Sequence, residues 1–214
     1  IDVNAPVDYL NKAKEALKSG DYKRALEFAE KGDDAIEQLV KDYQEAEEAI
    51  KGLEQAVNDA SESGIDAVAA AQTMAQAKET LEQKDYRKVA LLVHKGLSEV
   101  EGLLYRMAME HIEIAELVRN TGEKIGASMK EARDLFKDSV DSMKAKKFKQ
   151  AATSSDSCAA RAEALIKDHV SGFIMTVELA TEQVEGIDPA RPRELLTLAK
   201  QGFDQAEYDK SYEL

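Results

Sequence analysis

Few side chains in this sequence could do nucleophilic or metal chemistry. Nucleophilic catalysis requires a nucleophile, a base and an orienting group that converge in one pocket. The chain has three histidines and one cysteine, which are His94, His111, His169 and Cys158. No catalytic motif surrounds any of them, and neither His-Glu-x-x-His nor Glu-x-x-His brings metal ligands to one helix face. We therefore expect no enzyme, no metal centre and no cofactor.

Two of the histidines leave a rival hypothesis open. His111 and His169 lie near apolar positions of long predicted helices, where half-buried structural residues are expected. The alternative is a helical ligand-binding or enzyme domain that uses them. Because Cys158 is the only cysteine, no internal disulfide can form, and we expect it to be a small buried residue.

The charge balance makes two classes of partner improbable. The chain has 42 acidic residues against 29 basic ones and a net charge of −13, which disfavours a nucleic-acid backbone or an anionic membrane surface. No apolar run reaches the roughly 18 residues of a membrane span, so no membrane insertion is expected. Many carboxylates stand four residues before a lysine, which is typical of solvated helix faces. Examples of these expected pairs are Glu27–Lys31, Glu37–Lys41 and Glu47–Lys51.

One basic cluster departs from this alternation. It consists of Lys144, Lys146, Lys147 and Lys149. These lysines could dock an acidic protein partner. The alternative is structural, because lysines at a helix C-terminus complement the helix dipole.

An internal repeat organises the chain. Four aromatic residues recur at intervals of 64, 62 and 60 residues (86−22, 148−86, 208−148), and they are Tyr22, Tyr86, Phe148 and Tyr208. Twenty residues before each stands a helix-capping type, in order Asp2, Asp66, Ser128 and Asp188. Glycines that could end a preceding helix stand at Gly64, Gly126 and Gly186. The four segments align without a gap, which predicts four copies of one structural unit.

Each copy predicts a short helix of about 20 residues and then a long helix of about 40 residues. In the first copy the apolar residues Pro6, Leu10, Ala13 and Leu17 have the spacing of one helical face. The turns between short and long helices are expected at Gly20-Asp21, Lys84-Asp85, Lys146-Lys147 and Ala206-Glu207. No proline or turn cluster interrupts the apolar pattern of the long segments.

These lengths predict an all-α, elongated architecture of tandem three-helix bundles with repeats of about 62 residues. A long helix outreaches one short neighbour, so its first half would pack on the short helix before it and its second half on the short helix after it. The expected divisions are a partial repeat over 1–42, bundles over 43–105 and 106–168, and a partial repeat over 169–214.

Parts of this pattern resemble two known protein families. The layout of bundles that share a helix resembles spectrin-like tandem repeats, which implies a spacer. The residues Tyr9, Ala13, Gly20-Asp21-Tyr22, Ala25 and Ala29 resemble the interhelix turn of a tetratricopeptide motif, which implies stacked hairpins and a peptide-binding groove. The usual proline of that motif falls at Glu37, where the helical pattern continues.

We therefore expect a non-enzymatic scaffold or spacer that binds other proteins of unknown identity, and the tetratricopeptide-like peptide-binding module is the main alternative. Two apolar stretches, residues 67–71 with Met74 and residues 170–174 with Met175, are either core or a groove for a partner helix. The chain starts at Ile1 and has no signal-like segment, so we expect a cytoplasmic segment of a larger protein.

Overall fold

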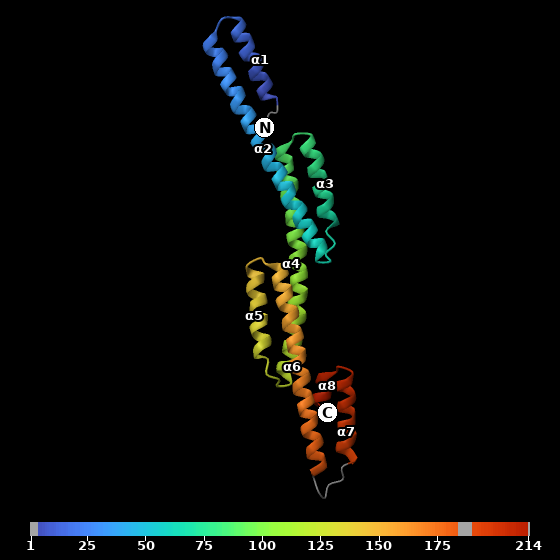
Figure 1. The fold of residues 1–214 in the computed structure, drawn as a ribbon. Helices are drawn as coiled ribbons and strands as arrows, with labels where there is room; N and C mark the ends of the chain where they lie inside the picture. Colours follow the sequence, from blue (N-terminus) through green and yellow to red (C-terminus); the bar gives the residue numbers. More distant parts are fainter. Residues whose placement is uncertain (1–3, 184–189, 214) are drawn as a thin grey trace. The chain divides into compact units, whose positions relative to one another are not determined.

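The structure is a computed structural model that describes residues 4–183 and 190–213. Over these residues the chain forms α-helices and no strand, which confirms the all-α prediction (Figure 1). The helices are α1 (Ala5–Lys18), α2 (Tyr22–Glu62), α3 (Val68–Glu82), α4 (Tyr86–Lys124), α5 (Lys130–Lys144), α6 (Phe148–Gln183), α7 (Ala190–Asp204) and α8 (Tyr208–Glu213).

Short and long helices alternate along the chain, as the sequence predicts (Figure 1). The short helices α1, α3, α5 and α7 have 14, 15, 15 and 15 residues. The long helices α2, α4 and α6 have 41, 39 and 36 residues. Helix α2 is unbroken through residues 40–45, and α4 is unbroken through residues 104–109. Each long helix is therefore more than twice as long as the short helix before it.

The chain divides into two compact units, residues 1–103 and residues 104–214, and the division falls inside α4. In the first unit both α1 and α3 pack on α2. The first part of α4 joins them through an edge-on contact of the Tyr43 and Tyr86 rings, whose centroids are 6.3 Å apart. The Thr73 hydroxyl of α3 also donates a hydrogen bond of 3.3 Å to Glu99 of α4.

The second unit has the same kinds of pairing. Helix α5 packs on α6, and α6 also contacts α7 and α8. The last part of α4 contributes Tyr105, whose ring lies edge-on to Phe148 with centroids 5.9 Å apart. The predicted divisions at 42/43, 105/106 and 168/169 stay predictions.

All four short-to-long turns share one geometry and lie where the sequence predicts them. The second residue after each short helix has a positive φ. It is 81° at Gly20, 60° at Lys84, 58° at Lys146 and 59° at Ala206. In the first turn the Gly20 amide donates to the Leu17 carbonyl over 3.2 Å, and the Asp21 amide donates to Ala16 over 3.0 Å. The other three turns repeat this pair of bonds, which is the Schellman arrangement.

The starts of the short helices differ from the prediction by one or two residues. The residue before α3 is Ala67 and the residue before α5 is Met129, and neither makes a side-chain capping bond. Both are buried, so packing rather than capping sets where these helices begin. Asp66 stands one residue earlier and accepts a hydrogen bond of 3.2 Å from the Val68 amide. The expected caps Asp2 and Asp188 lie outside the described residues.

Candidate functional site

The four clustered lysines lie around the α5–α6 turn. Lys144 is the last residue of α5, and its Nζ lies 3.6 Å from Asp141 one turn earlier. Lys146 has the positive φ of the turn, and the Lys147 amide donates to the Ser142 carbonyl over 2.9 Å. Lys149 lies in the first turn of α6. All four side chains are exposed, so they could contact a partner, and their role in docking stays a prediction.

The three histidines occupy separate places. His111 of α4 lies 2.5 Å from Asp156 of α6, between Nδ1 and Oδ1. His169 of α6 places Nε2 2.9 Å from the Ile125 carbonyl, and its ring lies beside Tyr212. Both are half-buried, as expected, whereas His94 is exposed. Among the described residues no three His, Cys, Asp or Glu side chains are grouped so that they could hold a metal ion.

Cys158 is a core residue, as predicted. It is fully buried, and its thiol donates to the Ala132 carbonyl over 3.1 Å. Burial raises the pKa of the thiol, although the nearby Arg119 charge opposes this shift. A buried thiol with a raised pKa is a poor nucleophile. Cys158 therefore contributes to the packing of the core.

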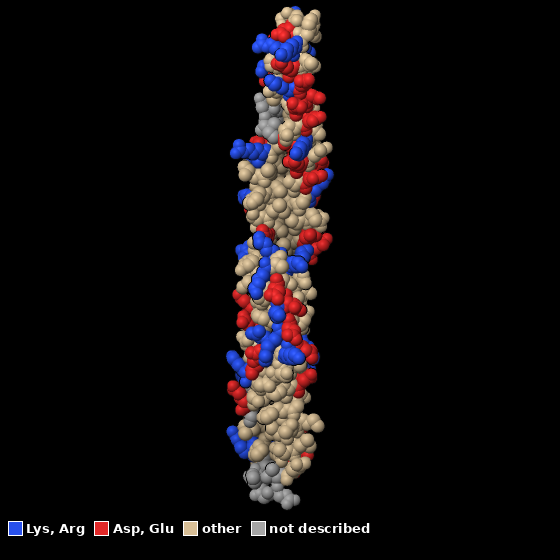
Figure 2. Space-filling model, turned by 90° about the vertical axis from the view of Figure 1, so that its left-hand side faces the viewer, with Lys and Arg blue, Asp and Glu red and all other residues tan. Residues whose placement is uncertain are grey.

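Acidic and basic side chains are interspersed on the face drawn in Figure 2. Several of them form local ion pairs. Of the three expected pairs, Glu47–Lys51 is present at 3.5 Å, while Lys41 pairs with Glu45 at 3.8 Å instead of with Glu37. Both carboxylates are four residues from Lys41, so the helix spacing allows either partner.

Other ion pairs connect different helices. Arg161 of α6 donates to Glu131 of α5 over 2.7 Å, and this hydrogen bond lowers the pKa of the Glu131 carboxyl. Lys78 of α3 pairs with Glu54 of α2 at 3.0 Å. Such pairs fix which faces of neighbouring helices meet, although exposed pairs contribute little stability.

An apolar groove lies between α1 and the first half of α2. Its volume is about 540 Å³, and it is open to solvent. The lining residues are Pro6, Val7, Leu10, Phe28, Ala29, Glu30, Gly32, Asp33 and Ile36. Leu10 lies on the apolar face predicted for the first short helix, yet it is 52% exposed, and Ile36 of α2 is 51% exposed.

A second hollow of about 380 Å³ lies among α6, α7 and α8. Phe173, Ile174 and Val177 contribute from α6, Leu195 and Leu196 among others from α7, and Tyr212 from α8. The ring of Phe173 lies 4.9 Å from that of Tyr212, measured between centroids. This hollow includes part of the second apolar stretch of the sequence.

The two apolar stretches prove to be mixed. In the first, Ala67 and Ala70 are buried, whereas Val68 is exposed. In the second, Val170 and Ile174 are buried, whereas Phe173 and Met175 are exposed. Both stretches therefore supply core residues on one helix face and apolar surface on another.

Sequence reasoning missed the α1–α2 groove. The apolar spacing of α1 and α2 predicts faces that pack together, and it does not indicate exposure. No signal in these residues marks the groove, because the spacing of Leu10 and Ile36 is the same whether another helix covers them or not.

Comparison with protein-family models, with curated proteins and with solved structures finds no match to this chain. In the described part of the chain, no helix is both long enough and apolar enough to cross a membrane.

Proposed function

We propose that this chain is a non-enzymatic scaffold or spacer segment of a larger protein, built from tandem three-helix bundles that share their long helices, and that it acts by binding other proteins. The proposed bundles correspond to residues 43–105 and 106–168. The layout is spectrin-like, and the turns between short and long helices are similar to tetratricopeptide turns.

One observation carries this proposal: an unbroken long helix packs against two different short helices. Helix α2 contacts α1 and α3, and α6 contacts α5 and α7. A helix of 41 residues is about 60 Å long, so two short helices of about 20 Å fit along it one after the other. Sharing a helix in this way would connect one bundle to the next without a flexible linker.

The main alternative is a peptide-binding module of the tetratricopeptide kind. That module requires separate helical hairpins that stack side by side, so its chain must reverse direction about every half repeat. The continuity of α2 and α4 through residues 40–45 and 104–109 argues against it. A catalytic or ligand-binding role for His111 or His169 is a weaker alternative, because each of these rings has a structural partner.

Small-angle X-ray scattering of the chain tests the proposal. A compact 214-residue chain has a radius of gyration of about 17 Å. A spacer of bundles connected by shared helices is expected to give a clearly larger radius and an elongated distance distribution. A radius near 17 Å would reject the spacer.

A further inference from the structure

Helices α1 and α2 expose positions that are less exposed in the next two copies. Ile36 is 51% exposed, whereas Val100 and Ala162 at the matching positions are 2% and 0% exposed. Tyr22 is 74% exposed, whereas its counterparts are less exposed: Tyr86 is half-buried and Phe148 is 8% exposed. The residue types are alike in the three copies, so the difference lies in what covers them.

In the second copy the cover is the last part of the preceding long helix. Leu53 of α2 is fully buried and lies over Gly96 of α4, where an added Cβ would come within 2.8 Å of the leucine. Gly32 is the residue that matches Gly96 (96−32 = 64), and it lines the α1–α2 groove. In the third copy, Ala115 of α4 is buried in the same cluster as Cys158, which matches Gly96.

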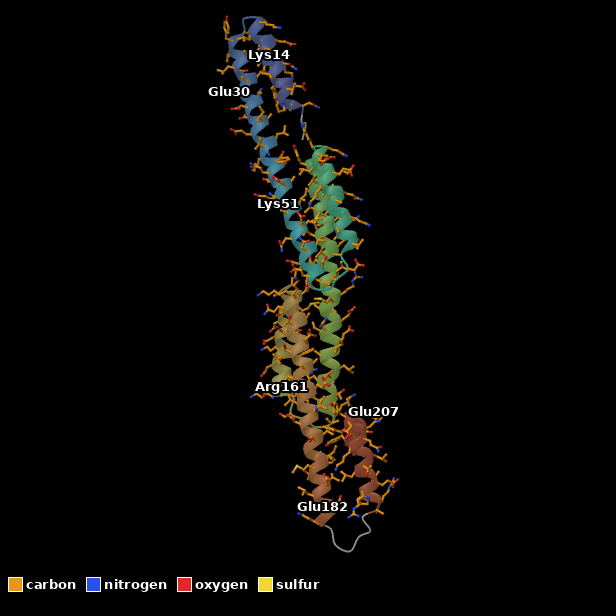
Figure 3. The ribbon with its side chains drawn as sticks, turned by 45° about the vertical axis from the view of Figure 1, so that its right-hand side comes forward. Lys14, Glu30, Lys51, Arg161, Glu182 and Glu207 are labelled. Atoms are coloured by element: carbon orange, nitrogen blue, oxygen red, sulfur yellow. The ribbon has the colours of Figure 1, made fainter. Side chains whose placement is uncertain are left out.

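Ion pairs also connect short helices to the long helix that precedes them in the chain. Lys78 of α3 and Lys200 of α7 stand at matching positions, and each pairs with a glutamate of the long helix before it, Glu54 at 3.0 Å and Glu178 at 2.6 Å. The third copy has Val140 at this position (78+62), and α5 instead pairs Arg133 with Glu123 of α4 at 3.0 Å. The matching residue of α1 is Lys14 (78−14 = 64), which is exposed and has no ion-pair partner among residues 4–183 and 190–213 (Figure 3).

We propose that the α1–α2 groove is a docking site for one amphipathic α-helix, supplied by a further repeat of this same kind. Its apolar ridge would match Ala46, Ile50, Leu53 and Val57 of α2, and a glutamate in the place of Glu54 would pair with Lys14. Burial of the exposed apolar residues of the groove drives the docking, and the charge pair sets the register. The inference rests on the proposed function, since it names the partner helix of one bundle.

The test supplies such a helix to the whole chain. A second copy of residues 43–64 is added directly before Ile1, so that its Gly64 precedes Ile1 as Gly64 precedes Ile65 in the chain. Covalent attachment gives a high effective concentration, so weak docking is still detected. The matched control carries Ile50→Asp and Leu53→Asp in the added copy only.

Hydrogen exchange of the backbone amides in residues 5–18 and 22–40 is the readout. We expect these amides to exchange about tenfold or more slowly with the added helix than with its control, because docking suppresses local opening. Equal exchange in the two chains would overturn the inference.

A charge exchange tests the register. Lys14→Glu in the chain with the added helix is expected to reverse most of the slowing, and Glu54→Lys in the added copy should restore it. Failure of the restoration would overturn the assigned pairing of Lys14.

Two further outcomes have fixed meanings. If the unaltered chain instead shows slowing in residues 5–40 that grows with concentration, together with a dimer in sedimentation, the occupant is a second copy and the further repeat is excluded. Amides of α3 and of the native residues 46–60 report on the proposed function separately. Their rapid exchange in every variant would refute the bundle, whereas their protection without slowing in α1 would refute only the docking site.

Discussion

At two facing positions of the repeat, the larger side chain lies on a different helix in different copies. In the first unit Leu53 lies over Gly96, and in the second unit the matching residues are Ala115 and Cys158, which belong to one buried cluster. In the first unit the large Leu53 side chain faces Gly96, which has no side chain. In the second unit the small Ala115 side chain lies in the same buried cluster as the larger Cys158. Close packing of interiors explains this, because either arrangement fills a similar space.

This packing predicts that the effects of Leu53→Ala and Gly96→Ala on the free energy of unfolding are strongly coupled. Leu53→Ala alone should cost about 2–5 kcal/mol of unfolding free energy, because it removes a fully buried side chain. Gly96→Ala should be more favourable in the Leu53→Ala background than in the unaltered chain, by about 1 kcal/mol or more. The added methyl group fills the cavity there, whereas it meets the leucine in the unaltered chain. Denaturation in urea gives the four free energies, and simple additivity would contradict the packing described.

Serines on opposite helices make equivalent hydrogen bonds in the third and fourth copies of the repeat. In the third copy Ser139 of α5 donates to the Ala151 carbonyl of α6 over 2.9 Å. In the fourth copy Ser211 of α8 donates to the Ala199 carbonyl of α7 over 2.7 Å. Ala199 matches Ser139, and Ser211 matches Ala151, so the hydroxyl comes from opposite helices. A small polar side chain at this crossing thus links α5 to α6 and α7 to α8.

We expect Ser139→Ala to lower the unfolding free energy by about 1 kcal/mol, because it leaves the buried Ser155 hydroxyl without the partner 2.6 Å away. Ser157→Ala is the control, since that exposed hydroxyl bonds only to the Thr153 carbonyl of its own helix. The control should change stability by less than about 0.5 kcal/mol. Equal losses from the two substitutions would contradict the role of Ser139.

At the scale of elements, the recurring turn is the most regular feature of the chain. The residue at the same place in each of the four turns has a positive φ, between 58° and 81°, and three of these residues are not glycine. A left-handed backbone conformation costs a residue with a side chain about 1–2 kcal/mol. The two Schellman bonds and the packing of both helices must offset this cost at Lys84, Lys146 and Ala206.

Lys84→Gly should therefore raise the unfolding free energy by about 1 kcal/mol, because glycine adopts φ near 60° without steric cost. Gln83→Gly is the matched control one residue earlier, where φ is −76°. The control should be neutral or destabilising, since glycine gains nothing there and increases the entropy of the unfolded chain. Thermal or urea unfolding of both variants distinguishes the conformational effect from simple removal of a side chain.

The elements could largely be predicted from the sequence, because their signals are local. The aligned aromatics and the apolar periodicity indicate the turns and the uninterrupted long helices within a residue or two. The starts of α3 and α5 were less predictable, since burial of Ala67 and Met129 outweighs capping by Asp66 or Ser128. Tertiary packing sets such boundaries, and a local pattern does not contain it.

The candidate site was less predictable for a related reason. Exposure of Leu10 and Ile36 depends on which helix lies over them, and the apolar pattern of α1 and α2 is the same whether they are covered or not. The partner of Lys41 was missed because two carboxylates are equally spaced from it. The identity of the proposed protein partner depends on surfaces outside the chain, so no pattern in these residues specifies it.

At the scale of the whole chain, two compact units each combine parts of long helices with short ones. The division falls within α4, so this helix supplies residues to both units. The chain has a net charge of −13, and several of its charged side chains form local ion pairs. The proposed spacer depends on the continuity of the long helices more than on any single contact.

The distance between spin labels at the two ends of α2 tests that continuity most directly. Lys23→Cys and Asn58→Cys place labels on exposed positions, with Cys158→Ala to remove the native thiol. Pulsed electron paramagnetic resonance should give a narrow distribution near about 53 Å, because 35 residues (58−23) rise about 1.5 Å each in an α-helix. A reversal at residues 40–45 would instead bring the labels close to the 8–10 Å spacing of packed helices, and that result would contradict the shared-helix account.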